Sequence, residues 1–124
     1  MIAVDTSSFI GFMQDDGGAD VDLVARIIAD AQLVFPPPVV AELLSDLSLP
    51  RVMGDRIASM PLLELLPGFW ARVGRLRAAL GKKYKARLAD TMIAQACIDH
   101  SVPLLTRDHD FKRYAKHAGL LLQM

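Results

Sequence analysis

Short apolar segments alternate with longer amphipathic ones along this chain. The short segments lie at 2–4, 33–35, 62–65, 103–105 and 120–122. Their length suits buried strands better than helices, although periodicity alone does not separate the two. Short buried strands that alternate with helices favour parallel pairing, with helices on both faces of the sheet. The pattern therefore predicts an α/β fold, a three-layer α/β/α sandwich around a central parallel sheet of four to five strands.

The longer segments carry apolar residues at helical spacing. They lie at 20–30, 36–47, 55–60, 69–80 and 90–100. Asp20 is a candidate N-cap for the first of them. The second opens with three prolines, and proline is favoured in the first turn of a helix. We expect each of these segments to cover one face of the sheet.

Length and composition limit the class of protein. The chain has 124 residues, of which 52% are hydrophobic and 23% charged, and this indicates one globular domain spanning 1–124. No apolar run approaches the roughly 18 to 20 residues that span a bilayer, and the N-terminus lacks a signal-peptide pattern. A single cysteine, Cys97, excludes an internal disulfide. We therefore expect a cytoplasmic protein that does not enter a membrane.

Charge is distributed unevenly although the formal net charge is zero. Residues 1–64 carry ten acidic and three basic side chains, whereas residues 65–124 carry four and eleven. The stretch 65–89 holds basic residues only, namely Arg72, Arg75, Arg77, Lys82, Lys83, Lys85 and Arg87. Such a run is usually a solvated helix face and loop, and the alternative is a surface that contacts phosphates. Trp70 and Tyr84 flank it and suit base stacking.

Carboxylates follow the predicted strands at the points where these end. Asp5 comes directly after the first apolar run, and Asp108 and Asp110 follow the fourth within "TRDHDF". Glu42 lies in the helix after the second run. In open α/β sheets, ligands bind outside the carboxyl ends of the strands. The acids are therefore expected near one rim, although Asp5 also suits a helix cap and one of the two later aspartates suits a turn.

Asp90 is the most informative acid by geometry. Asp90, Ile93, Ala94 and Cys97 fall at i, i+3, i+4 and i+7, so the carboxylate shares a stripe with residues that should face the sheet. A carboxylate aimed inward is costly unless it is paired, hydrogen-bonded or metal-bound. The alternative is that Asp90 caps its helix. For Glu42 the spacing alone favours a solvated position.

Converging carboxylates repel one another and stay ionised together only if a cation is present. Oxygen ligands without clustered cysteine or histidine suit Mg²⁺ or Mn²⁺ and not zinc. The three histidines are not spaced as a zinc site, and Cys97 has no activating neighbour, so we expect it in the core.

Four motifs in order carry a family resemblance. They are "VDTSSFI" at 4–10, "PPVVAELL" at 37–44, "RLADTMIAQAC" at 87–97 and "LLTRDHDF" at 104–111. Together the motifs resemble a PIN-domain ribonuclease, and more narrowly a VapC-like toxin of a type II toxin–antitoxin pair. The resemblance implies four catalytic acids, which match Asp5, Glu42, Asp90 and Asp108. It implies that Asp5, Asp90 and Asp108 hold Mg²⁺ or Mn²⁺, with Glu42 and Asp110 as additional candidate ligands and with Thr6 and Thr106 in support.

The resemblance also implies a reaction and partners. Bound divalent ions would polarise a phosphodiester of RNA and activate a water, leaving a 5′ phosphate and a 3′ hydroxyl without a covalent intermediate. A small antitoxin protein and a second copy of the chain are the expected partners. Phe9, Phe12 and Met13 offer apolar surface for such contacts, although core packing suits the two phenylalanines better.

The acidic site needs basic groups nearby to attract RNA. We expect these in the Arg72–Arg87 cluster together with Arg107, and reversing the charge of Arg75 and Arg77 should weaken RNA binding. Two other functions compete. An aspartyl phosphatase would need an acid where Ser7 stands. A PIN-like module without catalytic activity could bind RNA or protein, and metal-dependent cleavage lost in Asp5→Asn or Asp90→Asn would separate it from the nuclease.

Overall fold

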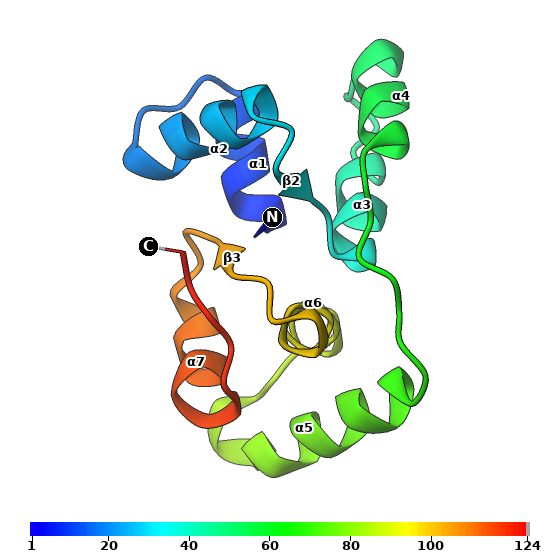
Figure 1. Ribbon diagram of the computed structural model, residues 1–124, viewed down its shortest axis with the longest axis vertical. Helices are drawn as coiled ribbons and strands as arrows, with labels where there is room; N and C mark the ends of the chain where they lie inside the picture. The colour runs from blue at the N-terminus through cyan, green and yellow to red at the C-terminus, as the bar shows by residue number, and fades with distance from the viewer. Residues whose placement is uncertain (124) are drawn as a thin grey trace.

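The computed structural model describes residues 1–123 and contains a small sheet surrounded by helices (Figure 1). The strands are β1 (Ile2–Val4), β2 (Leu33–Val34) and β3 (Leu104–Leu105). The helices are α1 (Thr6–Met13), α2 (Ala19–Ala29), α3 (Pro37–Leu44), α4 (Arg51–Ser59), α5 (Phe69–Tyr84), α6 (Leu88–His100), the 3₁₀ turn η1 (His109–Phe111) and α7 (Lys112–Ala118). Helices separate the three strands, and α2 to α6 lie in the segments predicted to be helical, whereas α1 and α7 lie in segments for which no helix was predicted.

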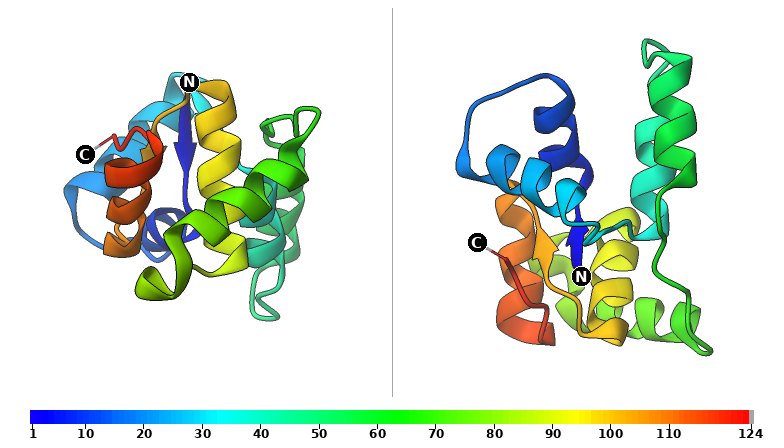
Figure 2. Two further views of the ribbon diagram at one scale, coloured as in Figure 1. Left: turned by 90° about the horizontal axis from the view of Figure 1, so that it is seen from below. Right: turned by 45° about the horizontal axis from the view of Figure 1, so that its top comes forward.

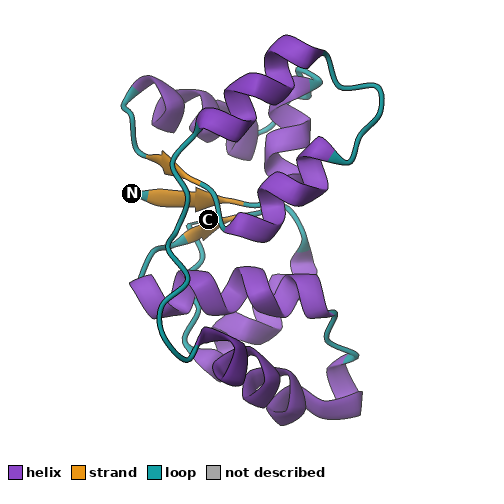
Figure 3. Cartoon of the chain, turned by 90° about the vertical axis from the view of Figure 1, so that its right-hand side faces the viewer, coloured by secondary structure: helices purple, strands orange, loops and turns teal. Residues whose placement is uncertain are grey.

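The three strands are parallel and lie in the order β2-β1-β3. Ala3 pairs with Val34 on one side and with Leu104 on the other, so β1 is the central strand. Figure 3 shows the strands between two groups of helices, with α5, α6 and α7 together on one side. The predicted α/β class with a parallel sheet is confirmed.

The predicted number of strands is wrong, because the sheet has three and not four to five. Segments 62–65 and 120–122 each make one parallel bridge, Phe35 to Leu62 and Leu104 to Leu122, at opposite edges of the sheet. Each edge segment pairs on one side only. Leu62 follows Pro61, which has no N–H to extend the ladder, and its side chain is 52% exposed. The apolar character of the two segments therefore predicted correctly that they lie at the sheet, but it predicted more backbone pairing than they form.

Local sequence explains where the helices begin and break. Proline opens α3, where its fixed φ suits the first turn. Gly18 and not Asp20 occupies the N-cap position of α2, so the predicted cap was wrong. Gly81 interrupts α5 with a φ of 59°, a left-handed conformation that glycine adopts without strain. This break turns the chain from α5 toward α6.

The core lies between the sheet and the helices on both of its sides. Its largest fully buried side chains include Phe9, Phe35, Phe111 and Tyr114, and Phe9 packs edge-on against Phe35 with ring centroids 5.1 Å apart. Cys97 is 1% exposed and burial raises the pKa of its thiol to about 12, so its predicted core position is confirmed. Within residues 1–123 no helix combines the length and hydropathy needed to cross a bilayer.

Seen from below, α7 lies to the left of β1 and α6 to its right (Figure 2, left), and both helices belong to the group that covers one face of the sheet. The chain ends β1 at Val4 and β3 at Leu105, and parallel pairing brings these two ends together. Since α6 lies beside them and starts at Leu88, its first turn is available to the same region. The fold thus brings three distant stretches of chain to one edge of the sheet.

Candidate metal centre

Asp5 lies at the carboxyl end of the central strand and is 5% exposed. Although Asp5 occupies the N-cap position of α1, its side chain makes no capping hydrogen bond within the part of the chain that the structure describes. Its Oδ2 instead accepts hydrogen bonds from Ser7 Oγ (3.0 Å) and Thr106 Oγ1 (2.8 Å). Asp5 is therefore held by hydroxyls from two segments, and it does not serve as a simple cap.

Thr106 joins the ends of β1 and β3. Its hydroxyl donates to Asp5 and accepts from the backbone N–H of Asp108 (3.0 Å). Ser7 Oγ lies 3.3 Å from the same hydroxyl. Sequence reasoning selected Thr106 but missed Ser7, whose only signal was its place in the polar run after Asp5. The hydroxyls fix the turn that carries Asp108 relative to the end of β1.

Glu42 comes from α3 and is exposed, but Thr6 holds it. Thr6 Oγ1 donates to Glu42 Oε1 at 2.9 Å, across 36 residues of sequence. The prediction from spacing that Glu42 is solvated is confirmed by its exposure. The same bond ties its carboxylate to the start of α1, one residue after Asp5.

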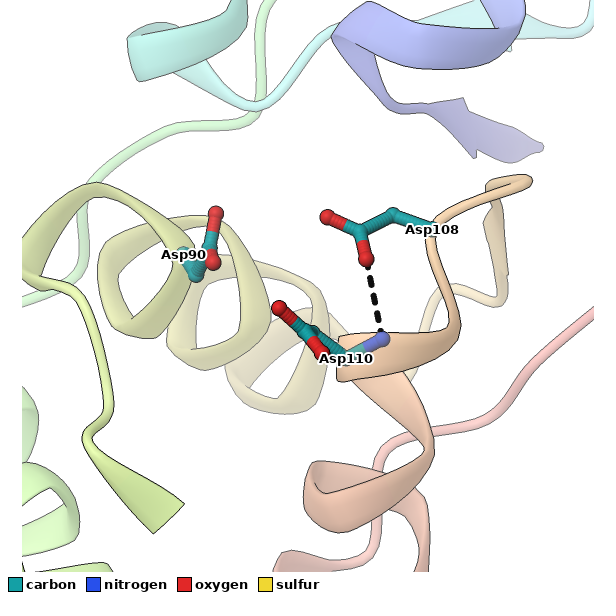
Figure 4. A group of neighbouring side chains, drawn as sticks. All are labelled: Asp90, Asp108 and Asp110. Carbon is teal, nitrogen blue, oxygen red and sulfur yellow. Dashed lines mark hydrogen bonds between the residues drawn. The ribbon is translucent and has the colours of Figure 1, made fainter.

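Asp90, Asp108 and Asp110 form the tightest group of acids. One oxygen of each lies within 4.8 Å of the others, and Figure 4 shows the three carboxyls directed toward a common space between α6 and η1. Asp108 Oδ1 also accepts the backbone N–H of Asp110 at 2.9 Å. Asp110 is exposed and pairs with Arg113 at 3.2 Å. Since α6 begins at Leu88, Asp90 lies inside its first turn and is not its cap.

The carboxylates lie close enough to perturb one another. The pKa of Asp90 is raised to about 6 by burial, and by the charges of Asp108, Asp5 and Glu42, against a smaller lowering by Arg87. Burial also raises the pKa of Asp5, and Asp108 adds to the rise, while hydrogen bonds from Thr106 and Ser7 oppose it. All four predicted catalytic acids therefore contribute to one electronegative region.

This donor set fits a hard divalent cation. In octahedral coordination with Mg–O distances near 2.1 Å, ligand oxygens are about 3 to 4.2 Å apart. The 4.8 Å grouping of Asp90, Asp108 and Asp110 is close to that separation, so small side-chain rotations suffice. Asp5 and Glu42 lie outside this closest group. Four or five carboxylates around one space favour cation binding, because the cation relieves their repulsion.

The family model for the PIN domain matches residues 2–117 of the chain. The chain belongs to the PIN-domain family. The predicted resemblance is thereby confirmed over nearly the whole length of the chain.

Solved structures share the fold of this PIN domain. A chain of VapBC2 from Rickettsia felis, bound to a DNA fragment from its promoter, aligns with a TM-score of 0.72 at 16% identity, covering 99% of this chain and 98% of that one. A chain of VapBC-5 from Mycobacterium tuberculosis aligns with a TM-score of 0.67 at 20% identity, and the alignment covers 99% of this chain and 98% of that one. A chain of a toxin–antitoxin complex from Klebsiella pneumoniae aligns with a TM-score of 0.66 at 17% identity, and the alignment covers 98% of this chain and 96% of that one. No curated protein matches.

The basic residues predicted to bind RNA divide into two groups in this PIN domain. Arg72 forms two hydrogen bonds to Asp99, at 2.9 and 2.6 Å, and Arg107 binds Asp20 at 2.8 and 3.0 Å. These two guanidinium groups are already paired with carboxylates. The remaining residues are exposed and form no ion pair within residues 1–123; they are Arg75, Arg77, Lys82, Lys83, Lys85 and Arg87.

The Arg107 contact is a feature that the sequence did not indicate. Its partner Asp20 also accepts from Ser8 Oγ at 3.0 Å, which links α1, α2 and the turn after β3. A Cβ at Gly11 would lie 2.8 Å from the Arg107 guanidinium carbon, so glycine leaves room for this contact.

Of the apolar residues considered for a partner contact, Phe9 is buried in the core. Phe12 and Met13 pack against the core while staying partly exposed.

Proposed function

We propose that this PIN domain, acting as one domain over 1–124, is a Mg²⁺- or Mn²⁺-dependent endoribonuclease. The observation that supports it is the grouping of Asp90, Asp108 and Asp110 within 4.8 Å beside the buried Asp5. Membership of the PIN family agrees with this chemistry. An acid cluster of this kind is costly to the fold unless it binds a cation.

In the proposed site, Asp90, Asp108 and Asp5 would hold the ion, and Asp110 and Glu42 would complete the ring of acids. The chemistry supplied by a bound divalent ion would be polarisation of the scissile phosphate and a lowered pKa for a water. Ser7 and Thr106 keep Asp5 ionised and oriented through their two hydrogen bonds. Thr6 holds the Glu42 carboxylate toward the start of α1. Hydrolysis by water leaves a 5′ phosphate and a 3′ hydroxyl, and the protein forms no covalent bond to RNA.

We further propose that the protein is the toxin of a VapBC-type pair, with a small antitoxin as partner, and that it acts as a homodimer in the cytoplasm. Support comes from the shared fold with chains of toxin–antitoxin complexes in three bacteria. The side of the sheet that carries α1 to α4 also exposes apolar side chains suited to a protein partner. These are Ile10, Leu44, Leu47 and Val52.

The test is RNA cleavage by the purified protein with Mg²⁺ or Mn²⁺ and with EDTA. We expect cleavage only with metal, and a loss of at least about 100-fold in Asp90→Asn and Asp108→Asn, since each removes a ligand charge. Asp30→Asn, an exposed acid at the end of α2, is the matched control and should retain activity. RNA binding without metal-dependent cleavage would instead favour the inactive binding module.

A further inference from the structure

A hollow of about 610 Å³ is lined by the second half of α5, the loop after it and the start of α6. Three cations line it, Arg77, Lys82 and Lys85, and no carboxylate does. Between them the lining consists of small or apolar residues, including Gly74 and Leu88. A floor without acids and with three cations around it suits a chain of phosphates whose sugars rest on apolar surface.

The cations of this hollow are available for a ligand. Arg77 donates only its Nε, to the carbonyl of Ala86 at 2.9 Å, and keeps its terminal nitrogens out of any ion pair within residues 1–123. Lys82 and Lys85 are exposed. Arg72 and Arg107 differ from them, because carboxylates already occupy both guanidinium groups. The structure therefore separates cations that carboxylates already bind from cations that have no carboxylate partner within residues 1–123.

Gly74 is a second, independent sign of a ligand surface. It stands in the middle of the long helix α5, where glycine is less stable than alanine. A Cβ placed there would meet nothing within 4 Å, so packing inside the protein does not require glycine. A bare backbone at the wall of a hollow is suited to close approach by a ligand.

Trp70 lies on the same stripe of α5. Trp70, Gly74, Arg77 and Gly81 follow the i, i+4, i+7, i+11 spacing of one helix face. The indole is 61% exposed and is the only tryptophan of the chain. The stripe from Trp70 to Gly81 is about 16 Å long at 1.5 Å per residue, long enough for a few nucleotides. An exposed aromatic ring beside cations is a typical platform for base stacking.

The hollow reaches the start of α6, the helix that carries Asp90. Leu88 lines it and also begins α6, and Asp90 follows two residues later in the same turn. Arg87 is exposed and lies in the sequence between Lys85 and the start of α6. The hollow therefore ends next to the helix that carries Asp90.

We propose that this hollow is the RNA-binding track of the protein, with phosphates held by Arg77, Lys82 and Lys85 and a base stacked on Trp70. The inference rests on the proposed nuclease function and names how its substrate is held. The track leads the strand past Arg87 to the carboxylates. It excludes Arg72 and Arg107 from RNA contact.

The test measures RNA binding in EDTA, where no cleavage interferes, with a single-stranded 12-nucleotide RNA of mixed sequence. Binding is followed by anisotropy of a labelled RNA and by fluorescence of Trp70. We expect the RNA to quench the tryptophan, and Lys82→Glu/Lys85→Glu to weaken binding at least tenfold at about 0.15 M salt, where screening limits distant effects. Absence of binding or of quenching by the wild-type protein would overturn the track.

Lys83→Glu is the matched control. Lys83 neighbours Lys82 on α5 but lies over the Tyr84 ring at 5.4 Å, in a separate hollow with His117. The sequence placed Lys83 and Arg75 in the basic cluster expected to bind RNA, but neither residue lines this hollow. We therefore no longer count them as RNA contacts, and we expect Lys83→Glu and Arg75→Glu each to change binding less than twofold. Equal weakening in the control and in the double variant would overturn the inference, because it would reflect net charge and not a site.

Gly74→Gln tests the shape of the hollow without changing charge. We expect it to bind RNA at least fivefold more weakly while its melting temperature stays the same or rises, since glutamine favours a helix over glycine. Undiminished binding by this variant would contradict the track. Binding that maps to the hollow without any metal-dependent cleavage leaves this inference standing and refutes the nuclease. Metal-dependent cleavage together with RNA binding that does not depend on Lys82 and Lys85 refutes this inference and leaves the nuclease proposal standing.

Discussion

At the scale of one residue, the position of the Asp90 carboxyl among other acids lowers the stability of the folded protein. The pKa of this carboxyl rises from 3.8 to about 6 because the group is half-buried and faces Asp108, Asp5 and Glu42. The folded protein thus holds this proton more tightly than the unfolded chain between about pH 4 and 6. Stability is therefore greatest below this window, falls as pH rises through it, and stays reduced above pH 6.

We predict that Asp90→Asn stabilises the metal-free protein at pH 7 to 8. A shift of about two units corresponds to about 3 kcal/mol at full strength, and solvent screening of a half-exposed group reduces this to on the order of 1 kcal/mol. Urea unfolding in EDTA at pH 5 and pH 8 measures it. The gain should be smaller at pH 5. A variant less stable than wild type at pH 8 would contradict the view that repulsion among these carboxylates destabilises the metal-free protein.

Thr106 is the residue on which the geometry of the site most depends, since one hydroxyl contacts both Asp5 and the Asp108 backbone. We predict that Thr106→Val weakens Mn²⁺ binding by about 10- to 100-fold, the usual effect of losing a group that orients metal ligands. Titration calorimetry at pH 7 measures the affinity. Thr106→Ser keeps the hydroxyl and should bind as wild type does. Equal affinity in the valine variant would remove Thr106 from the site.

At this scale the sequence predicted the acids better than their partners. Asp90 was identified because helical spacing put its carboxylate on an apolar stripe, and the structure places it beside Asp108. Ser7 was missed because its contact with Asp5 depends on how the chain turns after β1. Arg107 looked like an RNA ligand at the rim, but its partner Asp20 lies 87 residues away in sequence. Such pairings follow from tertiary structure and leave no local pattern.

At the scale of elements, an ion pair joins α5 to α6. Arg72 binds both oxygens of Asp99, whose side chain is only 8% exposed and also accepts from Gln95 at 2.8 Å. We predict that Arg72→Gln lowers the melting temperature by about 2 to 6 °C, because a nearly buried carboxylate loses its charged partner. RNA binding by the folded variant should equal that of wild type. A loss of binding at unchanged stability would return Arg72 to the RNA surface.

The two edge segments also differ from true strands in a measurable way. In the central strand, the Ala3 and Asp5 amides donate to Pro103 and Leu105, both at 2.9 Å. At the edges, Leu63 donates to Phe35 and Gln123 to Leu104, and each segment makes only one bridge. We predict that the Leu63 and Gln123 amides exchange with deuterium at least 100-fold faster than those of Ala3 and Asp5. Similar protection, measured by NMR, would indicate full edge strands.

This difference explains why the sequence overstated the sheet. The apolar runs at 62–65 and 120–122 have the same length and character as those that form strands. Period and hydropathy report that a segment is half-buried, but they do not count its hydrogen-bonding neighbours. Both segments pair on one side only and make a single bridge each, and Pro61 also limits the pairing of the first of them. Helices α2 to α6 were easier to predict, because their apolar stripes are longer and α3 and α5 begin or break at proline and glycine, whereas the shorter α1 and α7 were missed.

For the whole molecule, the fold separates charge across the sheet. Residues 1–64, with a formal net charge of −7, supply α1 to α4, and residues 65–124, with +7, supply α5 to α7 on the other side (Figure 3). The metal centre draws acids from both halves, since Asp5 and Glu42 come from the first and Asp90 and Asp108 from the second. A neutral protein can therefore present a basic side to RNA and an acidic side to another partner.

RNA binding should accordingly depend on salt although the net charge is zero. Each phosphate neutralised on a single strand contributes about 0.7 to the slope of log K against log salt. Three lining cations, with or without Arg87, predict a slope of about −2 to −3 between 0.05 and 0.3 M salt in metal-free titrations. Lys82→Glu/Lys85→Glu should flatten the slope by about 1.4, and Lys83→Glu should leave it unchanged. A wild-type slope near zero would show that phosphates are not what this side of the molecule binds.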